Sequence, residues 1–353
     1  MSDPSFELLR PWLQNAPEPT LWLADENLIG SRLHPTPSVT MISNRLDLVD
    51  AARAIGWRAD WSDFDLSGRA DGSVARIVYR VSKEKPLVHH CINEAWRVLR
   101  TGGELILSGD KSEGVKGYLD RAKKLFGDGE LEKVSGNCWR GRFIRTEQTG
   151  TRLDDREYEQ LRPACRDQEH TFWSKPGVFG WDKVDKGSAF LIDHLDDFVA
   201  ALAAPPDRIL DLGCGYGYLT LKAARFGAPI VATDNNAAAV AACRRNIAEY
   251  AIDAEVVPAS CGEGIKQRFA LILCNPPFHA GFSVEDDLTE RFLDATARLL
   301  ETGGIAGFVV NRHIMLERRA AGRFRRIETL AENGSFKLVL LADAICPESR
   351  LFP

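Results

Sequence analysis

The sequence lacks several features that would place the protein in a special structural class. It has no apolar run of about 18 residues, as a membrane-spanning helix requires. Its first residues, MSDPSFELLRPW, carry neither the basic start nor the apolar segment of a signal peptide. The nearest of its eight cysteines, Cys261 and Cys274, stand 13 positions apart (274 − 261), so no C-x2-C zinc or redox motif exists. We therefore expect a soluble, cytoplasmic protein with reduced thiols, no membrane association and no bound metal.

The chain also lacks a strong charge of one sign. Its 353 residues include 45 Lys and Arg against 50 Asp and Glu, a net charge of −5, while apolar and charged residues make up 44% and 27%. These ordinary values exclude wholesale disorder and low-complexity structure. The length suggests two domains at about 100–200 residues each. A polyanionic partner would have to meet a local basic patch, because the overall field does not attract it.

A weak internal repeat indicates how the chain is organised. Residues 74–109 and 269–310 each contain a short β-like run, a polar loop, a helical stretch ending in Leu-x-Thr-Gly-Gly and a second β-like run. Thr101 corresponds to Thr302, an offset of 302 − 101 = 201 positions. Two copies of one α/β unit are therefore expected.

Strand-like and helical stretches alternate on both sides of the repeated segments. This alternation predicts an α/β fold with mainly parallel twisted sheets, and ligands at the carboxyl ends of the strands. A polar stretch over residues 146–170 separates the halves, and we place the boundary near residue 155. The expected domains are 1–155 and 156–353.

The sharpest local signal is a glycine-rich loop in RILDLGCGYGYLTLKAARFG (208–227). An apolar strand carrying Asp211 is followed by alternate glycines at Gly213, Gly215 and Gly217. Glycine permits a tight turn and close approach of a ligand to the backbone. The G-x-G-x-G spacing differs from the dinucleotide pattern G-x-G-x-x-G, and Asp211 would repel a pyrophosphate but suits the ammonium and sulfonium of S-adenosylmethionine. The next strand ends at Asp234, where a carboxylate can accept hydrogen bonds from ribose hydroxyls.

A second motif, Asn275-Pro276-Pro277-Phe278, follows the fourth apolar run. The two prolines fix a stiff extended turn. The Asn275 side-chain carbonyl and the Pro276 backbone carbonyl can each accept an N–H of a planar amine, and Phe278 can stack on its ring. This arrangement favours direct methyl transfer to an amine. Cys274 lies in the apolar run LILC and is interpreted as a buried thiol, not a nucleophile.

Together these motifs resemble the class I S-adenosylmethionine-dependent methyltransferases. More narrowly, the chain resembles the bacterial ribosomal RNA guanine-N2 methyltransferases acting on small-subunit (RsmC-like) or large-subunit (RlmG-like) RNA. The matching stretches are GVFGWDKVDKGSAFL (177–191), ILDLGCGYG (209–217), ILCNPPFHAG (272–281) and GSFKLVL (334–340). The resemblance implies two tandem Rossmann-like methyltransferase domains, the N-terminal one degenerate, and methylation of the N2 amine of a guanine in ribosomal RNA, with the small subunit favoured.

The resemblance also assigns residues to each site. Cofactor binding is assigned to Phe179, Asp185, Gly187, Asp211, Gly213, Gly215, Gly217, Asp234, Asn235 and Asn275. Guanine is assigned to Asn275, Pro276, Pro277 and Phe278. Ser260 is a candidate cofactor contact, because it stands where such enzymes commonly have an adenine-binding Asp. In the first half, Arg80-Val81-Ser82-Lys83 replaces the NPPF motif and no glycine triplet precedes it, so this domain is expected to dock RNA and support its partner without cofactor.

Arginines supply candidate RNA contacts. NRHIMLERRAAGRFRR (311–326) holds six arginines and one acid and follows the fifth strand, so we expect a patch near the catalytic edge that grips RNA backbone. The proposed contacts are Arg312, Arg318, Arg319 and Arg323. In the first half, RAKK (121–124), Arg140, Arg142 and Arg145 are weaker candidates.

Several functions remain open at this point. An Asn-Pro-Pro-aromatic motif can also hold the N6 amine of adenine or a glutamine side chain of a protein, although Tyr is commoner than Phe in the glutamine enzymes. The stretch NRH (311–313) resembles the large-subunit type and NPPFHAG the small-subunit type. A cofactor-binding ribosome assembly factor without catalysis is the non-enzymatic alternative.

Overall fold

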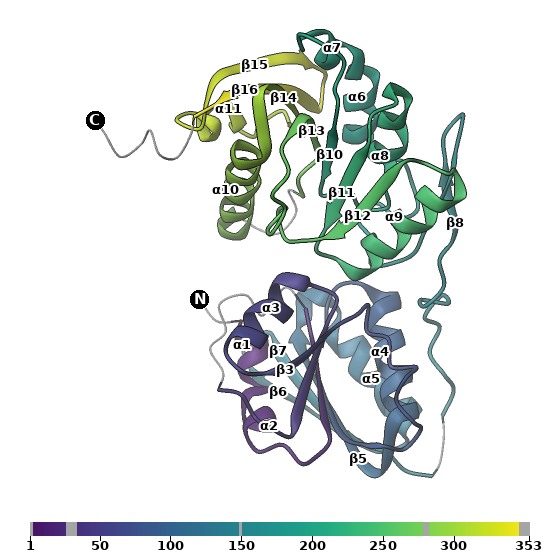
Figure 1. Cartoon of the computed structure of the whole chain (residues 1–353). Helices are drawn as coiled ribbons and strands as arrows, with labels where there is room; N and C mark the ends of the chain where they lie inside the picture. The colour runs from purple at the N-terminus through teal and green to yellow at the C-terminus, as the bar shows by residue number, and fades with distance from the viewer. Residues whose placement is uncertain (1–2, 26–33, 148–149, 278–281, 346–353) are drawn as a thin grey trace. The chain divides into compact units, whose positions relative to one another are not determined.

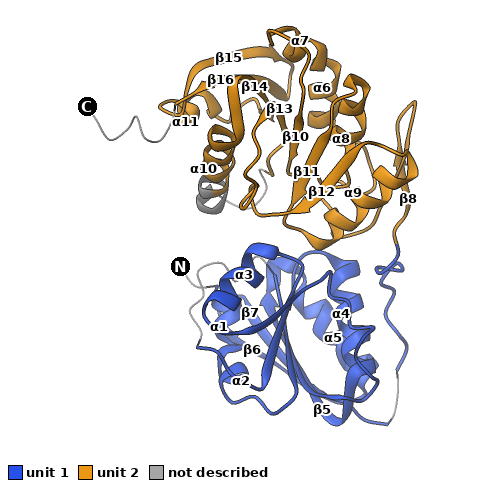
Figure 2. Cartoon of the chain, in the orientation of Figure 1, with its two compact units in different colours: residues 1–160 blue, residues 161–353 orange. Residues whose placement is uncertain are grey.

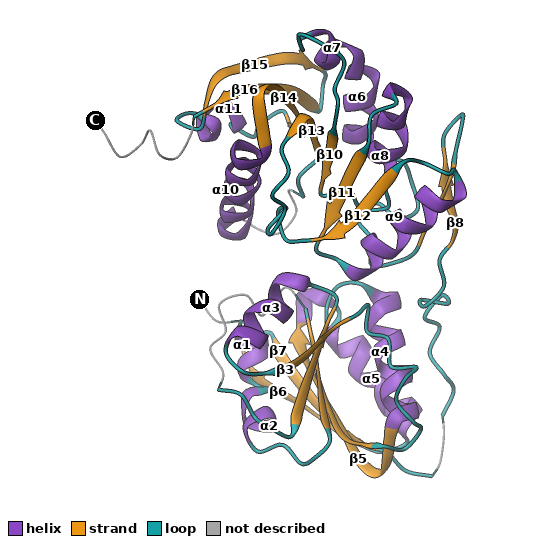
Figure 3. Ribbon diagram, in the orientation of Figure 1, coloured by secondary structure: helices purple, strands orange, loops and turns teal. Residues whose placement is uncertain are grey.

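The computed structural model describes residues 3–25, 34–147, 150–277 and 282–345, with side chains in the last range from residue 288 onward. The chain divides into two compact units, residues 1–160 and 161–353 (Figure 2). Each unit combines a mainly parallel sheet with helices (Figure 3). The predicted α/β class with mainly parallel sheets is confirmed.

Unit 1 contains, among its described residues, a seven-stranded sheet in the order β3-β2-β1-β4-β5-β7-β6. The strands from β3 to β5 are parallel, and β7 and β6 complete an antiparallel edge. The strands are β1 (Thr20–Ala24), β2 (Val39–Ser43), β3 (Arg58–Trp61), β4 (Val74–Arg80), β5 (Leu99–Asp110), β6 (Gly129–Ser135) and β7 (Cys138–Ile144). The helices are α1 (Pro4–Glu7), α2 (Arg10–Gln14), α3 (Leu46–Ala54), α4 (Lys85–Val98), α5 (Val115–Phe126) and the 3-10 turn η2 (Lys111–Glu113).

Unit 2 repeats this topology with the order β12-β11-β10-β13-β14-β16-β15 over the part of the chain that is described, and adds the small hairpin β8-β9 (Figure 1). Its strands are β8 (Arg162–Arg166), β9 (Thr171–Ser174), β10 (Ile209–Leu212), β11 (Ile230–Asp234), β12 (Ala254–Pro258), β13 (Phe269–Cys274), β14 (Leu300–Asn311), β15 (Phe324–Glu332) and β16 (Phe336–Ala344). Its helices are α6 (Lys186–Asp193), α7 (Leu195–Ala200), α8 (Tyr218–Ala223), η3 (Ala224–Phe226), α9 (Ala237–Glu249), α10 (Phe282–Leu299) and α11 (Leu316–Ala320).

The central strands of unit 2 are buried on both faces, as their continuous apolar runs require. Every residue of β10 and β13 is buried. On one face, Phe292 and Leu293 of α10 and Leu316 of α11 join the core of the sheet. On the other, Gly307 of β14 lies so close to Phe198 of α7 that a Cβ would come within 3.1 Å of the ring. Helices on both faces leave the carboxyl ends of the parallel strands for a ligand site.

The two sheets can be compared position by position through their registers. Thr20 of β1 pairs with Arg76 of β4, as Ile209 of β10 pairs with Leu271 of β13. The next strands match in the same way, with Leu107 and Phe308 at equivalent places on β5 and β14. Three pairs of equivalent positions follow from this register: Trp22 and Asp211, Ser43 and Asp234, Arg80 and Asn275.

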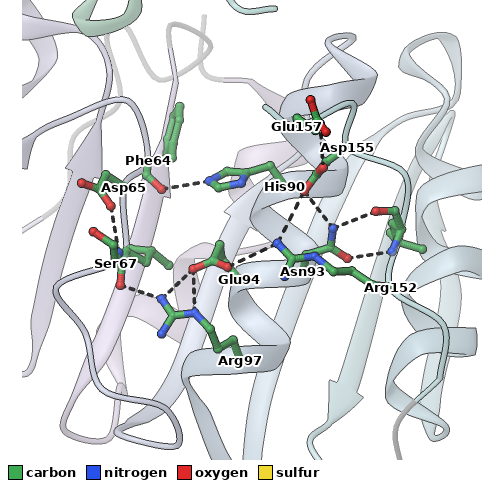
Figure 4. Close-up of polar contacts among 12 residues, drawn as sticks. Phe64, Asp65, Ser67, His90, Asn93, Glu94, Arg97, Arg152, Asp155 and Glu157 are labelled. Atoms are coloured by element: carbon green, nitrogen blue, oxygen red, sulfur yellow. Dashed lines mark hydrogen bonds and ion pairs between the residues drawn. The ribbon is translucent and has the colours of Figure 1, made fainter. Parts of the chain in front are cut away.

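The polar segment that ends unit 1 is fixed to α4 (Figure 4). Asn93 donates a hydrogen bond to the Leu153 carbonyl at 2.9 Å and accepts one from the Leu153 N–H at 2.8 Å. The buried Tyr158 hydroxyl donates to Asp63 at 2.8 Å, and its ring stacks on His90. The segment up to Tyr158 is therefore part of unit 1, and the chain leaves this unit just before β8.

Candidate active site

The glycine loop after β10 has a separate reason for each glycine. Gly213, Gly215 and Gly217 have φ angles of 88°, 53° and 90°, the left-handed region that glycine adopts without strain. A side chain at Gly217 would also come within 2.8 Å of the Cys243 sulfur, whereas no atom lies within 4 Å of a Cβ built on Gly215. A Cβ built on Gly213 would lie 3.4 Å from the nearest ring atom of Phe292. The loop is thus packed at its ends and open at Gly215, where a ligand can approach the backbone.

Asp234, at the carboxyl end of β11, holds the loop in this shape. Its carboxylate accepts hydrogen bonds from the Gly215 N–H at 3.0 Å and the Asn236 N–H at 2.9 Å. Asn236 caps α9 and donates to the Gly177 carbonyl at 3.2 Å. The predicted contacts Asp234 and Gly215 are therefore brought together, and the half-exposed Asn235 follows beside them.

Asn246 is a structural residue of this site that sequence reasoning missed. It is fully buried on α9, donates to the carbonyls of Tyr216 in the glycine loop at 2.8 Å and Trp173 in β9 at 2.9 Å, and accepts from the Trp173 N–H at 2.7 Å. It ties the loop to the hairpin β8-β9. Its sequence signal is a polar residue at helical spacing with the buried Ala242 and Cys243.

Asp211 lies inside its strand. It is buried within β10, one residue before the end of the strand, and not at the tip. One carboxylate oxygen accepts the Thr220 hydroxyl at 2.6 Å, while Oδ1 has no hydrogen-bond partner among the described residues. Burial raises the pKa of Asp211 to about 7. The hydrogen bonds from Thr220 lower this pKa, and the negative charge of Asp234 raises it further. An orphaned buried carboxylate oxygen fits a cationic group of a cofactor, which would complete its interactions.

The loop before α6 brings two predicted residues from distant parts of the chain together. Asp185 caps α6 by accepting the Ser188 N–H at 2.8 Å. The Asn275 side-chain nitrogen donates to the same Asp185 oxygen and to the Ser188 hydroxyl, both at 2.8 Å. In the sequence, Gly187 lies between Asp185 and Ser188. A Cβ built on Gly187 would come within 3.2 Å of the Phe336 ring. Ser188 is a second residue that the sequence analysis did not single out.

The other predicted residues near Asn275 and before α6 differ in their exposure to solvent. Pro276 is buried and Pro277 exposed, whereas Phe278 lies outside the described residues. Phe179 is 54% exposed on the loop before α6. Burial raises the pKa of the Cys274 thiol well above its usual value, so this residue is a protonated core thiol, consistent with its interpretation from the sequence.

Ser260 lies two residues after Pro258, the last residue of β12. It is buried, and its hydroxyl accepts a hydrogen bond from Arg291 of α10 at 2.6 Å. This contact fixes the hydroxyl beside the end of the strand, and Arg291 was not anticipated. The assignment of Ser260 to cofactor binding stays a prediction.

The expected arginine patch is divided between the two ends of the sheet. Arg312 follows β14 at its carboxyl end, and its side chain is 63% exposed and 3.3 Å from Glu332. Arg323 instead precedes β15 near the amino-terminal part of β14, because antiparallel pairing returns the chain along the sheet. It forms ion pairs with Glu290 at 2.7 Å and Asp294 at 2.6 Å. The prediction of a single patch at the catalytic edge is therefore wrong for Arg323.

The other arginines differ in their surroundings. Arg318 of α11 is exposed, and Arg319 is half-buried. In unit 1, Arg140 pairs with Glu132, Arg142 pairs with Glu104, and Arg145 lies 3.6 Å over the Trp96 ring. These three unit 1 side chains are held by structural contacts, which weakens their candidacy as phosphate ligands.

Known proteins similar to this chain identify its family. The model of the methyltransferase small domain family matches residues 169–340. A ribosomal RNA small subunit methyltransferase C from Shewanella loihica is 28% identical over 267 residues, covering 74% of this chain and 75% of the relative. The Pseudomonas paraeruginosa protein of the same name is 33% identical over 246 residues, covering 67% and 70%. The chain belongs to the ribosomal RNA small subunit methyltransferase C family. The resemblance inferred from the sequence motifs is thereby confirmed.

A solved member of the family has the same architecture. The T. thermophilus 16S rRNA N2 G1207 methyltransferase, solved in complex with AdoMet and guanosine, superposes with a TM-score of 0.82 at 25% identity. The match covers 97% of this chain and 92% of the other, so it includes both units.

The described residues contain neither a membrane-spanning helix nor a metal-binding cluster. None of their helices combines the length and apolar character needed to cross a bilayer. Their His, Cys, Asp and Glu side chains do not form a group of three that could hold a metal ion.

Proposed function

We propose that this chain transfers a methyl group from S-adenosylmethionine to the exocyclic N2 amine of a guanine in small-subunit ribosomal RNA. Family membership supports the enzyme class, and the relative from T. thermophilus supports the guanine acceptor. The observation that carries the proposal is the contact of Asn275 with Asp185 and Ser188. It anchors the Asn-Pro-Pro corner at the strand end that neighbours the glycine loop of β10.

Some residues of this chain bind the cofactor, and others orient the acceptor amine. Asp234 accepts from the ribose hydroxyls, Asp211 meets a cationic group, and the open backbone at Gly215 admits the cofactor. S-Adenosylmethionine, when bound, supplies the methyl group as a sulfonium. The Asn275 and Pro276 carbonyls accept the N–H groups of guanine N2 and direct its lone pair toward the methyl carbon. After transfer the amine loses its proton to solvent.

We further propose that unit 1 binds no cofactor and supports the catalytic unit or docks RNA. At the positions of Asp211 and Asp234 it carries Trp22 and Ser43. Trp22 stacks on Phe6 with ring centroids 5.6 Å apart, which fills the place of the carboxylate with apolar core. At the position of Asn275 it carries Arg80, whose buried guanidinium is bound by Asp3 and Glu113.

The proposal is tested by mass spectrometry of ribosomal RNA from strains with and without the gene. We expect one N2-methylguanine of the small-subunit RNA to disappear in the deletion strain and return when the wild-type gene is restored. Loss of a large-subunit mark, an N6-methyladenine or a methylated glutamine would redirect the assignment to that substrate. Unchanged methylation of all of them would favour an assembly factor.

RNA affinity distinguishes Arg312 from Arg323. Arg312→Ala is expected to weaken RNA binding and to reduce the slope of log affinity against log salt by about 1, because one phosphate contact is lost. Arg323→Ala is expected to leave that slope unchanged and to lower stability, because Glu290 and Asp294 lose their partner. Filter binding over a salt series and thermal melts measure both effects. Equal slopes for Arg312→Ala and wild type would remove Arg312 from the RNA interface.

A further inference from the structure

We infer that Asp185 and Ser188 are positioning residues that set the hydrogen-bond polarity of the acceptor site, so that it admits an N–H donor and disfavours a base without one. The inference rests on the proposed function. It begins from the two hydrogen bonds that the Asn275 amide nitrogen donates to Asp185 Oδ1 and Ser188 Oγ, each 2.8 Å long.

The chemistry of the partners decides which way the Asn275 amide points. An amide has two N–H donors on nitrogen and an acceptor on oxygen, so its orientation follows from the partners that each end meets. An ionised carboxylate can accept but not donate. Turning the amide over would place Asn275 Oδ1 against Asp185 Oδ1, two acceptors in contact. Asp185 therefore requires the Asn275 nitrogen on the α6 side.

Both N–H groups of Asn275 are used by these contacts. The amide has no donor left for the methyl acceptor, and its oxygen remains to accept. An incoming base that presents an N–H satisfies this oxygen. A base that presents a C–H at the same place leaves the oxygen unpaired in a partly buried site, which disfavours binding.

The first turn of α6 fixes this arrangement before any substrate arrives. Asp185 Oδ1 also accepts the Ser188 N–H at 2.8 Å, so the cap of the helix and the orientation of Asn275 share one atom. Ser188 is buried, and Gly187 is confined by the Phe336 ring. Preorganised polar groups contribute to catalysis because they need no reorganisation when charge develops.

Guanosine and inosine form a direct pair of probes. Inosine differs from guanosine by replacement of the 2-amino group with hydrogen, and the T. thermophilus relative was solved with guanosine. We expect wild-type protein, saturated with S-adenosylmethionine or its demethylated product, to bind guanosine about tenfold more tightly than inosine, the effect of one or two hydrogen bonds. Competition against labelled guanosine measures the ratio.

Ser188→Ala removes one of the two bonds that hold the amide. We expect its guanosine-to-inosine ratio to fall by about threefold and kcat to fall with it, while the KM for S-adenosylmethionine stays unchanged. Lys186→Ala, an exposed residue of the same helical turn, is the matched control and should keep the wild-type ratio. A Ser188→Ala protein with wild-type discrimination would overturn the inference.

An exchange of the two side chains tests the polarity itself. Asn275→Asp alone places two carboxylates in contact and should lower kcat by at least a hundredfold. Adding Asp185→Asn restores a donor–acceptor pair with an oxygen of residue 275 still available, so the double variant should regain at least tenfold over Asn275→Asp. Equal activity of the Asn275→Asp single variant and the double variant would contradict the inference.

The outcomes separate this inference from the proposed function. Wild-type protein that methylates no guanine N2 would remove the function and the inference with it. Wild-type methylation combined with unaltered discrimination in Ser188→Ala and no rescue in the exchange would leave the function standing and remove the positioning role.

Discussion

Asn275→Ala is expected to reduce methyl transfer by about 10²–10³-fold, the effect of removing one preorganised hydrogen-bonding group from a reacting centre. The variant loses the side-chain carbonyl that orients the acceptor amine. Cofactor affinity should fall much less than the rate of transfer, because Asn275 is only one of the residues assigned to the cofactor and Asp211, Asp234 and Gly215 are untouched. Single-turnover methylation of ribosomal RNA and calorimetric titration with S-adenosylmethionine measure the two quantities separately.

Cys274→Ala provides the neighbouring control for this result. Cys274 is the buried last residue of β13, and its pKa is raised by burial, so alanine should cost some stability and leave the rate of transfer within a few-fold of wild type. Nearly full activity in Asn275→Ala would remove the catalytic role from the amide, and a large loss of activity in folded Cys274→Ala would assign a role to the thiol. Parallel thermal melts identify any loss that reflects unfolding.

The parts of the fold that follow from local pattern were predictable from the sequence. The duplicated Leu-x-Thr-Gly-Gly segments indicated two related units, and the structure gives both sheets the same strand order. Parallel strands place their carboxyl ends at one edge. The motifs at Asp211, Asp234 and Asn275 could therefore be assigned to one site without coordinates, because each lies within or directly after such a strand.

The missed features depend on contacts between distant segments. Ser188 and Asn275 are 87 positions apart, and Asn246 and Trp173 are 73 apart. Ser188 and Asn246 each resemble an ordinary polar residue of a helix. Their importance comes from burial and from the particular backbone groups that they meet, which periodicity does not encode.

The arginine segment shows how strand direction can defeat a local interpretation. Residues 311–326 form one basic stretch in the sequence. In the fold, however, β15 begins at the edge of the sheet where the parallel strands begin, opposite to their carboxyl ends. There Arg323 forms ion pairs with Glu290 and Asp294 of α10. A charge count within the segment does not include acids contributed by another helix. Chain reversal therefore places Arg312 and Arg323 at opposite ends of the sheet, and Arg323 is paired with two acids of α10.

The buried Asp211 makes both stability and cofactor affinity depend on pH. Its pKa is about 7 in the folded protein against 3.8 as the ordinary value, so the folded state retains a proton that the unfolded state has lost. For an acid with a raised pKa, stability is fully present below about pH 4 and decreases as the pH rises toward 7. The full cost of ionising Asp211 above pH 7 is about 4 kcal/mol.

Asp211→Asn is accordingly expected to stabilise the cofactor-free protein at pH 8 and to weaken cofactor binding. The stabilisation should shrink by about 3 kcal/mol between pH 8 and pH 5, because the wild-type carboxyl becomes protonated over this range and then resembles the amide.

A cationic cofactor group favours the ionised carboxylate, so wild-type affinity for the cofactor should fall by up to about tenfold for each pH unit below 7. The Asp211→Asn variant should lack this pH-dependent component. Denaturant titrations and calorimetry at several pH values measure the two trends. The exposed substitution Asp207→Asn is the control for a change in net charge. Parallel pH profiles of stability for wild type and Asp211→Asn would show that Asp211 remains ionised in the fold. Equal cofactor affinities of the two proteins would show that Asp211 does not meet the cofactor's charge.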